Sequence, residues 1–234
     1  MKQIAFIGGT DKLDTLIYVG SIISGTEGEK HTLIVDFTKL SKSRYVVPTL
    51  EEKSRYVTTY NQVDVAVGYT NFNQLLEDQV IVIDQNGESN YKYILFDMDQ
   101  NPLMYGIQFT ENDLIFAYTN LDLYSLNILK KAFEELQIQI PISKVILSKK
   151  MKRADVEYVN YIVNNPNIIW SQYIIMFPFE NGDQSVIFEN QRAQRFNLKP
   201  FSAQFKKGIE NLAILITNGE LKGISNYMRY VEKT

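Results

Sequence analysis

The residues best placed to do chemistry follow the first apolar run of the chain, Ile4 to Ile7, where the sequence continues GGTDK. Gly8 and Gly9 permit a tight turn, and Lys12 adds a positive charge where a helix is expected to begin. A strand, a glycine turn and a helix in this order can place main-chain amides and a lysine around phosphate groups. This stretch therefore raises the hypothesis of a nucleotide site.

The full phosphate-binding pattern is G-x-x-x-x-G-K-[ST], in which the lysine neutralises phosphate and the hydroxyl binds magnesium. With Lys12 on the template lysine, Phe6, Asp11 and Leu13 stand where the two glycines and the hydroxyl residue should be. A carboxylate about 4 Å from a phosphate charge repels it by roughly 4 kcal/mol at an effective dielectric constant of about 20. The helix amino end returns only about 0.3 to 1 kcal/mol. The alternative interpretation is structural: the glycines permit the turn, and Thr10 or Asp11 caps the helix.

Other polar residues offer weaker hypotheses. Asp97 and Asp99 end an apolar run, so they could bind a cation or cap the next turn, and Asp97 is a weak metal candidate. His31 is the single histidine, and the sequence indicates no partners with which it could form a catalytic triad. We therefore expect His31 to have a surface or strand-edge role.

Two segments raise the question of binding partners. The segment SKKMKR has four basic residues, which form either an anion patch or a solvated helix entrance: Lys149, Lys150, Lys152 and Arg153. The second interpretation is favoured over a DNA contact. Aromatic residues are dense between residues 41 and 72, and less so near the carboxyl end, where interface and core packing are both open: Tyr45, Tyr56, Tyr60, Tyr69, Phe72, Tyr227 and Tyr230.

The elements that must position these residues alternate between apolar runs and helical patterns. Most of the runs lack apolar/polar alternation, which is typical of strands that are covered on both faces. They lie at 3–7, 32–37, 63–67, 80–84, 92–97, 113–119, 144–148 and 172–177. Apolar residues at helical spacing predict helices over 123–136, 156–163 and 205–216, the last with Ser202 as a start signal.

Strand and helix in alternation predict a doubly wound α/β fold, with a mostly parallel sheet of about seven to eight strands and helices on both faces. The segment QNGES at 85–89 predicts a hairpin turn, so we expect one antiparallel excursion. No linker, repeat or composition break divides the chain. We therefore expect residues 1–234 to form a single domain.

Composition excludes several classes of function. The formal net charge is −3, so no global basic field indicates nucleic acid or an anionic membrane. There is no cysteine, which excludes disulfides, thiolate metal sites and a cysteine nucleophile. No apolar run is long enough for a signal peptide or a membrane span. We expect a cytoplasmic protein.

Taken with the order of elements, these motifs give the chain a resemblance to the MinD/ParA family, the SIMIBI-type P-loop ATPases whose deviant Walker A loop reads K-G-G-x-G-K-[ST]. Gly8, Gly9 and Lys12 match that loop, whereas Ile7 replaces its signature lysine. TLIVDF resembles the family's second strand, with Asp36 as its acidic residue and Thr38 in place of the next one. YKYILFDMD resembles the Walker B strand and places Asp97 at its aspartate, and Ser148 stands where the family has an adenine-reading asparagine.

The resemblance implies a MinD-like fold with a degenerate active site, because the signature lysine, the second glycine and the magnesium hydroxyl are all replaced. Atypical relatives such as the TadZ-like proteins of pilus systems act as positioning components. We therefore expect a non-hydrolysing scaffold of a bacterial secretion, conjugation or pilus assembly, with protein partners, no cofactor and a nucleotide-independent homodimer. The alternative is a nucleotide-switched partitioning ATPase that uses ATP and magnesium, in which Lys12 neutralises phosphate, Asp97 holds magnesium through water and Asp36 orients the attacking water.

Overall fold

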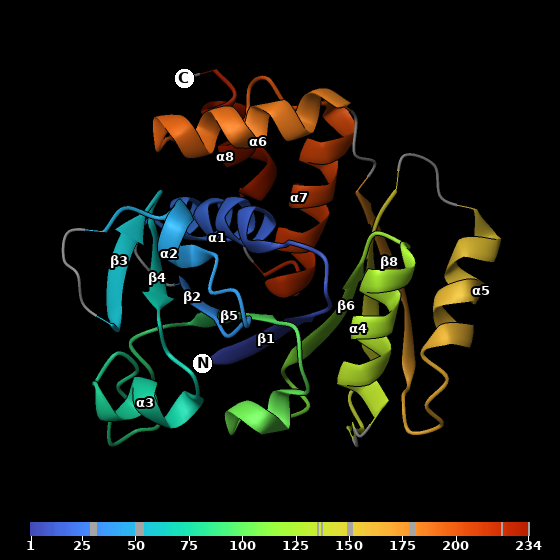
Figure 1. The fold of residues 1–234 in the computed structure, drawn as a ribbon. Coiled ribbons are helices and arrows are strands. Elements are labelled where there is room, and N and C mark those ends of the chain that lie inside the picture. The colour runs from blue at the N-terminus through green and yellow to red at the C-terminus, as the bar shows by residue number, and fades with distance from the viewer. Residues whose placement is uncertain are drawn as a thin grey trace.

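A computed structural model describes residues 1–28, 32–49, 54–134, 136, 138–148, 152–177, 181–220 and 222–233. The strands form one eight-stranded sheet in the order β3-β4-β2-β5-β1-β6-β7-β8, with helices on both faces (Figure 1). The predicted doubly wound, mostly parallel α/β architecture is therefore confirmed. His31 lies outside the described residues.

The first strand lies at the centre of the sheet, where β1 pairs in parallel with β5 and with β6. Among the described strands, β3 and β4 form the one antiparallel pair. The strands are Lys2–Ile7 (β1), Thr32–Asp36 (β2), Tyr56–Tyr60 (β3), Val63–Val67 (β4), Tyr93–Met98 (β5), Leu114–Thr119 (β6), Ile142–Leu147 (β7) and Trp170–Phe177 (β8). Parallel strands bring their carboxyl ends to one edge, so the segments after β1, β2, β5 and β6 lie together there.

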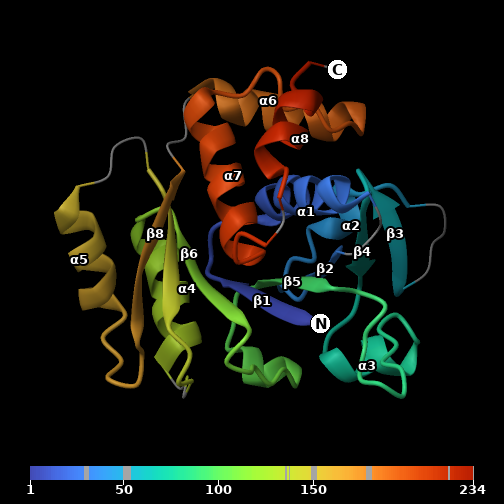
Figure 2. The same ribbon diagram turned by 180° about the vertical axis from the view of Figure 1, so that it is seen from behind.

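Two apolar cores lie on the two faces of the sheet. The first is covered by α1, α6, α7 and α8, and the second by α3, α4 and α5 (Figures 1 and 2). The helices are Leu13–Glu27 (α1), Ser43–Val46 (α2), Phe72–Glu77 (α3), Leu123–Glu134 (α4), Arg153–Ile162 (α5), Asn181–Ala193 (α6), Ala203–Ile216 (α7) and Ile224–Val231 (α8), with a 3-10 turn at Pro102–Tyr105 (η1). The predicted helices at 123–136, 156–163 and 205–216 correspond to α4, α5 and α7, and Ser202 caps α7 by accepting from the Phe205 amide.

The strand predicted at 80–84 is wrong. Val82 and Ile83 are 48% and 51% exposed and lie outside both cores. The Asn90 side chain accepts from the main-chain N–H of Val82 and donates to the carbonyl of Val80, at 2.9 Å each. Because these local bonds satisfy the main chain, the segment does not need a place in the sheet.

The antiparallel excursion exists, but not where the sequence predicted it. At 85–89 the structure has only an isolated bridge between Ile83 and Ser89. The regular hairpin joins β3 to β4 through Asn61 and Gln62, whose φ values are 50° and 69°. Two-residue turns of this kind favour glycine at the second position, so Gln62 conceals the signal.

A lysine lies inside the sheet. Lys144 on β7 is 3% exposed, and its Nζ sits 3.8 Å from the centre of the Trp170 ring. Burial lowers the pKa of Lys144 to about 8. The contact with the indole face partly replaces the lost water.

We predict a rise in stability with pH that depends on Lys144. Between about pH 8 and the unfolded-state pKa near 10.5 the folded chain binds fewer protons than the unfolded chain, so the free energy of unfolding increases with pH. Lys144→Met should flatten this rise, because the variant has no amine to titrate there. Urea unfolding at about pH 7.5 and 9.5 measures the effect, and an equal rise in both proteins would contradict it.

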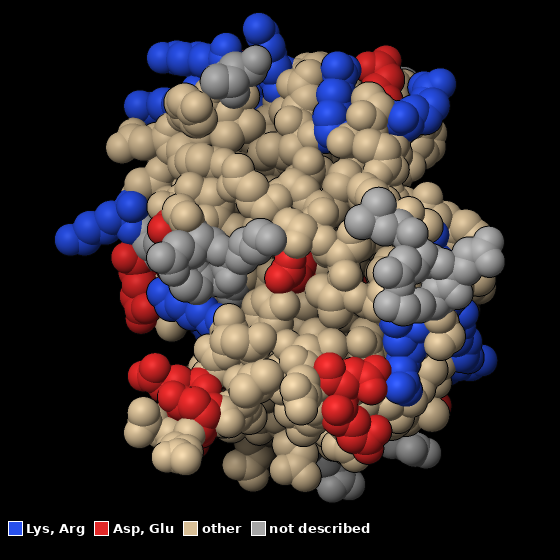
Figure 3. Space-filling model, turned by 90° about the vertical axis from the view of Figure 1, so that its left-hand side faces the viewer, with Lys and Arg blue, Asp and Glu red and all other residues tan. Residues whose placement is uncertain are grey.

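Charge is unevenly spread over the surface. On the face in Figure 3, Lys and Arg side chains lie along the top and at both sides, and Asp and Glu side chains lie mainly in the middle and lower parts. Within the described ranges, every helix is too short or too polar to cross a bilayer.

Candidate functional site

The glycine turn after β1 is fixed by packing. A Cβ on Gly8 would lie 2.0 Å from the carbonyl oxygen of Tyr118, and one on Gly9 would lie 2.8 Å from Cβ of Ile128. The Gly8 N–H donates to the carbonyl of Met98 at 3.0 Å, so this amide is not free to face an anion. Close approach to β6 and α4 therefore explains both glycines without phosphate.

The loop lysine folds back into the protein. Lys12 is 2% exposed, and its Nζ donates to the Gly8 carbonyl at 2.9 Å and pairs with Asp97 Oδ1 at 2.7 Å. Burial raises the pKa of Asp97 to about 6, although Lys12 acts in the opposite direction; nearby Asp36 adds to the rise. The positive charge that a phosphate would need is thus neutralised by an internal carboxylate.

Asp36, the acidic residue that the family resemblance places at the end of the second strand, is also held by internal hydrogen bonds. Asp36 and Asp97 are register partners on β2 and β5, so the structure brings Lys12, Asp36 and Asp97 to one edge of the sheet. Asp36 Oδ1 accepts from the N–H and hydroxyl of Thr38 at 3.0 and 2.6 Å, and its Oδ2 accepts from the Ser43 amide at 2.9 Å. Asp36 therefore holds the turn into α2.

Asp11 in the loop has an ion-pair partner that could not be recognised from the sequence. Asp11 does not pair with Lys12; it forms a short ion pair with Lys42, which also lies 3.4 Å from Asp14. Burial opposes the charge of Lys42, but Asp14 and Asp11 outweigh it and raise its pKa. Gln191 on α6 donates to both Asp14 oxygens at 2.8 and 2.9 Å, so this network ties the loop to α2 and α6.

The predicted helix cap is wrong. Lys12, not Thr10 or Asp11, is the N-cap residue of α1, and it makes no side-chain capping bond. The Thr10 hydroxyl accepts from the Asn120 amide at 3.1 Å, and the Asp11 carboxylate is held by Lys42. Long-range partners therefore win over local capping at this turn.

The loop position where the phosphate-binding pattern has its magnesium-binding hydroxyl is occupied here by a core residue. Leu13 is fully buried, and the Thr15 hydroxyl lies 2.9 Å from the Tyr118 hydroxyl. Asp99 accepts from the Lys39 amide at 3.1 Å and from the Tyr105 hydroxyl at 3.4 Å. Nowhere in the described ranges do three acidic or histidine side chains gather in a way that could hold a metal ion.

The basic segment is only partly described, because Lys149 and Lys150 lie outside the described residues. Lys152 is the N-cap residue of α5, and Arg153 pairs with Glu157 at 2.9 Å on a fully solvated surface. The described half therefore lies at an exposed helix entrance, and the choice between an anion patch and a solvated helix entrance stays a prediction.

The aromatic residues divide between core and surface. Tyr60 and Tyr69 are buried, whereas Tyr45 and Tyr230 are 83% and 62% exposed. Tyr227 packs on α1, where a Cβ on Gly25 would lie 2.1 Å from its hydroxyl.

Exposed apolar side chains lie on both sides of the loop after β1, which we call the closed loop because its lysine, Lys12, is buried against Asp97. Leu40 and Tyr45 follow β2 and are 84% and 83% exposed, and Leu123 and Tyr124 follow β6 and are 65% and 70% exposed. Of these four residues, only Tyr45 was singled out from the sequence; Leu123 begins the apolar pattern that predicts the helix at 123–136, and a pattern of this kind is expected to be buried. Large exposed apolar and aromatic residues of this kind are typical of protein interfaces.

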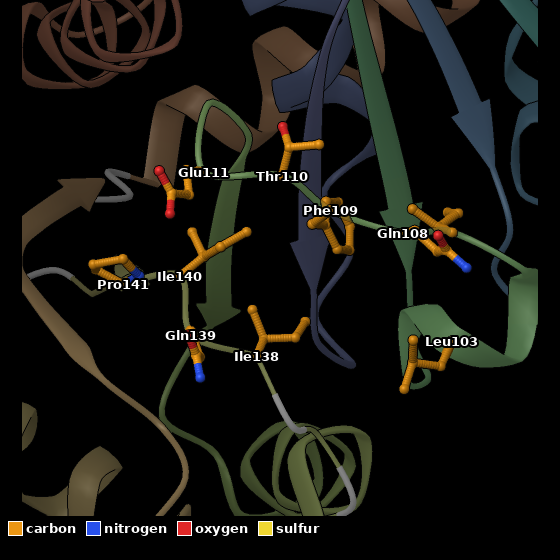
Figure 4. Close-up of a pocket in the computed structure, with 10 residues that line it drawn as sticks. Leu103, Gln108, Phe109, Thr110, Glu111, Ile138, Gln139, Ile140 and Pro141 are labelled. Carbon is orange, nitrogen blue, oxygen red and sulfur yellow. The ribbon is translucent and has the colours of Figure 1, made fainter.

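Among the cavities at the opposite edge of the sheet, two adjoin each other. The first, about 600 Å³, lies between residues 107–111 and 138–141, where Phe109, Ile138 and Ile140 face one another (Figure 4). The second, about 770 Å³, lies between β6, β7, β8 and α7 and shares Ile140 and Glu111 with the first. Neither cavity could be predicted from the sequence, because the first is lined mainly by connections with no motif and the second by the packing of α7 against three strands.

A glycine turn after the central strand of a doubly wound sheet occurs in several nucleotide-binding α/β folds, P-loop folds among them. The fold is similar to that in the MinC:MinD cell division protein complex of Aquifex aeolicus, at 12% identity and a TM-score of 0.51 over 100% of this chain and 97% of the other. It is also similar to a Borrelia burgdorferi protein, provisionally described as a plasmid partition protein and bound to AMPPNP, at 14% identity and a TM-score of 0.49 over 93% of this chain and 100% of the other. No protein-family model and no curated protein matches the sequence. The predicted MinD-like fold is confirmed.

Proposed function

We propose that this protein is a non-hydrolysing, MinD/ParA-like scaffold or positioning subunit of a bacterial assembly such as a secretion, conjugation or pilus apparatus. It is a TadZ-like pseudo-ATPase that works in the cytoplasm by binding protein partners. The observation that carries the proposal is the closed loop, in which Lys12 is buried against Asp97 and the Gly8 carbonyl.

The energetics of the loop support this role. A nucleotide must displace Asp97 from Lys12 and leave that carboxylate buried without its cation, at a cost of several kcal/mol. Asp11 is held by Lys42, so neither residue is free to contact phosphate, and the buried Leu13 gives magnesium no oxygen. Turnover is therefore not the function that these residues favour.

The surface around the loop supports a protein partner. Leu40, Tyr45, Leu123 and Tyr124 present exposed apolar area on both sides of it. The neighbour from Aquifex aeolicus is described as a complex of two proteins, which makes a protein partner a reasonable analogy. We propose that a homodimer, if formed, is independent of nucleotide.

The second candidate is a nucleotide-switched partitioning ATPase. It is favoured by the meeting of Lys12, Asp36 and Asp97 at one edge, since these are the residues that the family resemblance assigns to phosphate, water and magnesium. In that case the ion pair of Lys12 and Asp97 would be the resting state that ATP and magnesium open.

Calorimetric titration with ATP and magnesium separates the two candidates. We expect no heat of binding at millimolar ATP, because the phosphate position is already neutralised. The matched control is Lys39→Ala, which removes an exposed lysine from the same edge. Micromolar binding that is retained in Lys39→Ala and lost in a Lys12→Ala variant with the wild-type circular dichroism spectrum would overturn the scaffold proposal.

A further inference from the structure

The sheet ends in an open strand at β8. Within the described ranges no strand pairs with its outer side, and β8 is the outermost strand in Figure 2. The Ser148 amide donates to the Phe177 carbonyl at 3.0 Å, so the main-chain groups of Phe177 and Ile175 face β7. Those of Ile174 and Met176 consequently face outward, because main-chain groups alternate along a strand.

From Ile174 to Phe177 this edge lacks the usual protection by charge, proline or a bulge. The eight residues of β8, WSQYIIMF, include no charged residue and no proline. Ile174 and Met176 are 37% and 38% exposed, so α5 does not cover them. The irregular register with β7 lies before Ile174, and regular pairing runs from there to Phe177. An apolar strand edge of this kind is a template for another strand.

The 770 Å³ cavity opens beside this edge. Its walls are Leu114, Ile175 and Leu215, with Ile214 and Tyr173 at the rim, 38% and 55% exposed. Ile174, whose side chain belongs to the other face, also lines it, so the cavity extends to the edge of β8. A chain added to β8 would therefore find a place for an apolar side chain.

The polar lining selects the charge of the occupant. None of the described lining residues is Lys, Arg or His, and Glu111 is an exposed carboxylate at the end of the cavity. Asp113 is buried there, and its carboxylate accepts hydrogen bonds from the main-chain N–H of Gln3 and from the main-chain N–H and hydroxyl of Thr110. Anionic ligands are disfavoured, and a basic side chain is complementary.

We propose that an extended peptide segment of a partner protein adds to β8 as a ninth strand, places a large apolar side chain in the cavity and directs a Lys or Arg toward Glu111. Main-chain bonds to Ile174 and Met176 supply affinity, and the cavity supplies specificity. A second copy of this chain fits less well, because its own β8 has no basic residue for Glu111. The inference rests on the partner-binding part of the proposed function, not on the state of the nucleotide loop.

The test uses a phage-displayed library of random ten-residue peptides on the full chain, followed by anisotropy titrations with the enriched peptides. We expect large apolar residues at alternate positions together with Lys or Arg. Ile174→Pro removes an outward-facing donor without breaking a bond to β7, and should weaken binding by about tenfold or more. Glu111→Lys should weaken binding of basic peptides, whereas Val57→Ser, on the edge strand β3 at the other end of the sheet, should bind them normally.

The outcomes decide between occupants. If Ile174→Pro does not fold, Ile214→Lys blocks the rim of the cavity from the helix side and takes its place. No enrichment, or enriched peptides that bind these variants as tightly as wild type, would overturn the proposal. Concentration-dependent self-association that Ile174→Pro abolishes would assign the edge to a second copy instead. ATP binding in the calorimeter would reject the scaffold role and leave the peptide result standing.

Discussion

Lys12→Ala is expected to destabilise the protein by about 3 to 5 kcal/mol at neutral pH, because it leaves Asp97 as a buried carboxylate without its cation. The loss should be smaller in acid. Asp97 has a pKa raised to about 6 in the folded state, and removal of Lys12 raises it further, so the folded variant takes up a proton more readily than the unfolded chain. Its free energy of unfolding should therefore fall as pH rises, through a window that extends above that of wild type.

Urea unfolding at about pH 5 and pH 8 measures this effect. The matched control is the double substitution Lys12→Met with Asp97→Leu, which removes both charges and should recover much of the loss, since a buried ion pair adds little over apolar residues of similar size. A Lys12→Ala variant as stable as wild type at pH 8 would show that the ion pair does not form in solution, and the closed-loop argument would lose its basis.

Gly8→Ala is expected to cost more than about 3 kcal/mol, because its Cβ would lie 2.0 Å from a main-chain oxygen on a central strand that cannot move aside. Gly8 also has a φ of 154°, a main-chain angle that L-residues with a side chain rarely adopt. The effect should be present without any nucleotide, since it comes from packing against Tyr118.

The control is Gly182→Ala, a helical glycine in α6 with nothing within 4 Å of the added Cβ. It should be neutral or stabilising by up to about 1 kcal/mol. Thermal unfolding of both variants measures the difference. If Gly8→Ala unfolded like wild type, the glycine could no longer be explained by packing, and a ligand role would be the better account.

Much of the fold could be predicted because buried parallel strands consist of short, nearly continuous apolar runs. The runs at 3–7, 32–37, 63–67 and 92–97 match β1, β2, β4 and β5 within one residue at each end. β3 was missed because YVTTY is half polar, and the run at 80–84 was misread because its bonds come from Asn90. In both cases tertiary context outweighed the local pattern.

The candidate site was predictable in its residues but not in its contacts. The resemblance named Lys12, Asp36 and Asp97, and the structure gathers them at one edge. The partner of Asp11 could not be predicted, because Lys42 is 31 residues away and reaches the loop only through the turn after β2. Similarly, the cavity lies beside the open edge of β8 because of the path that α7 takes, and this arrangement has no sequence signature.

The central position of β1 has a consequence for synthesis on the ribosome. β1 leaves the ribosome before its two neighbours, β5 and β6, and stays unpaired until they have been made. The apolar face of α1 waits longer still, since α7 and α8 cover it, and the Lys2 amine bonds the carbonyl of Ile216. The nascent chain therefore exposes its future core until α7 and α8 have been made, and loss of these two helices would prevent folding of the first half of the sheet as well.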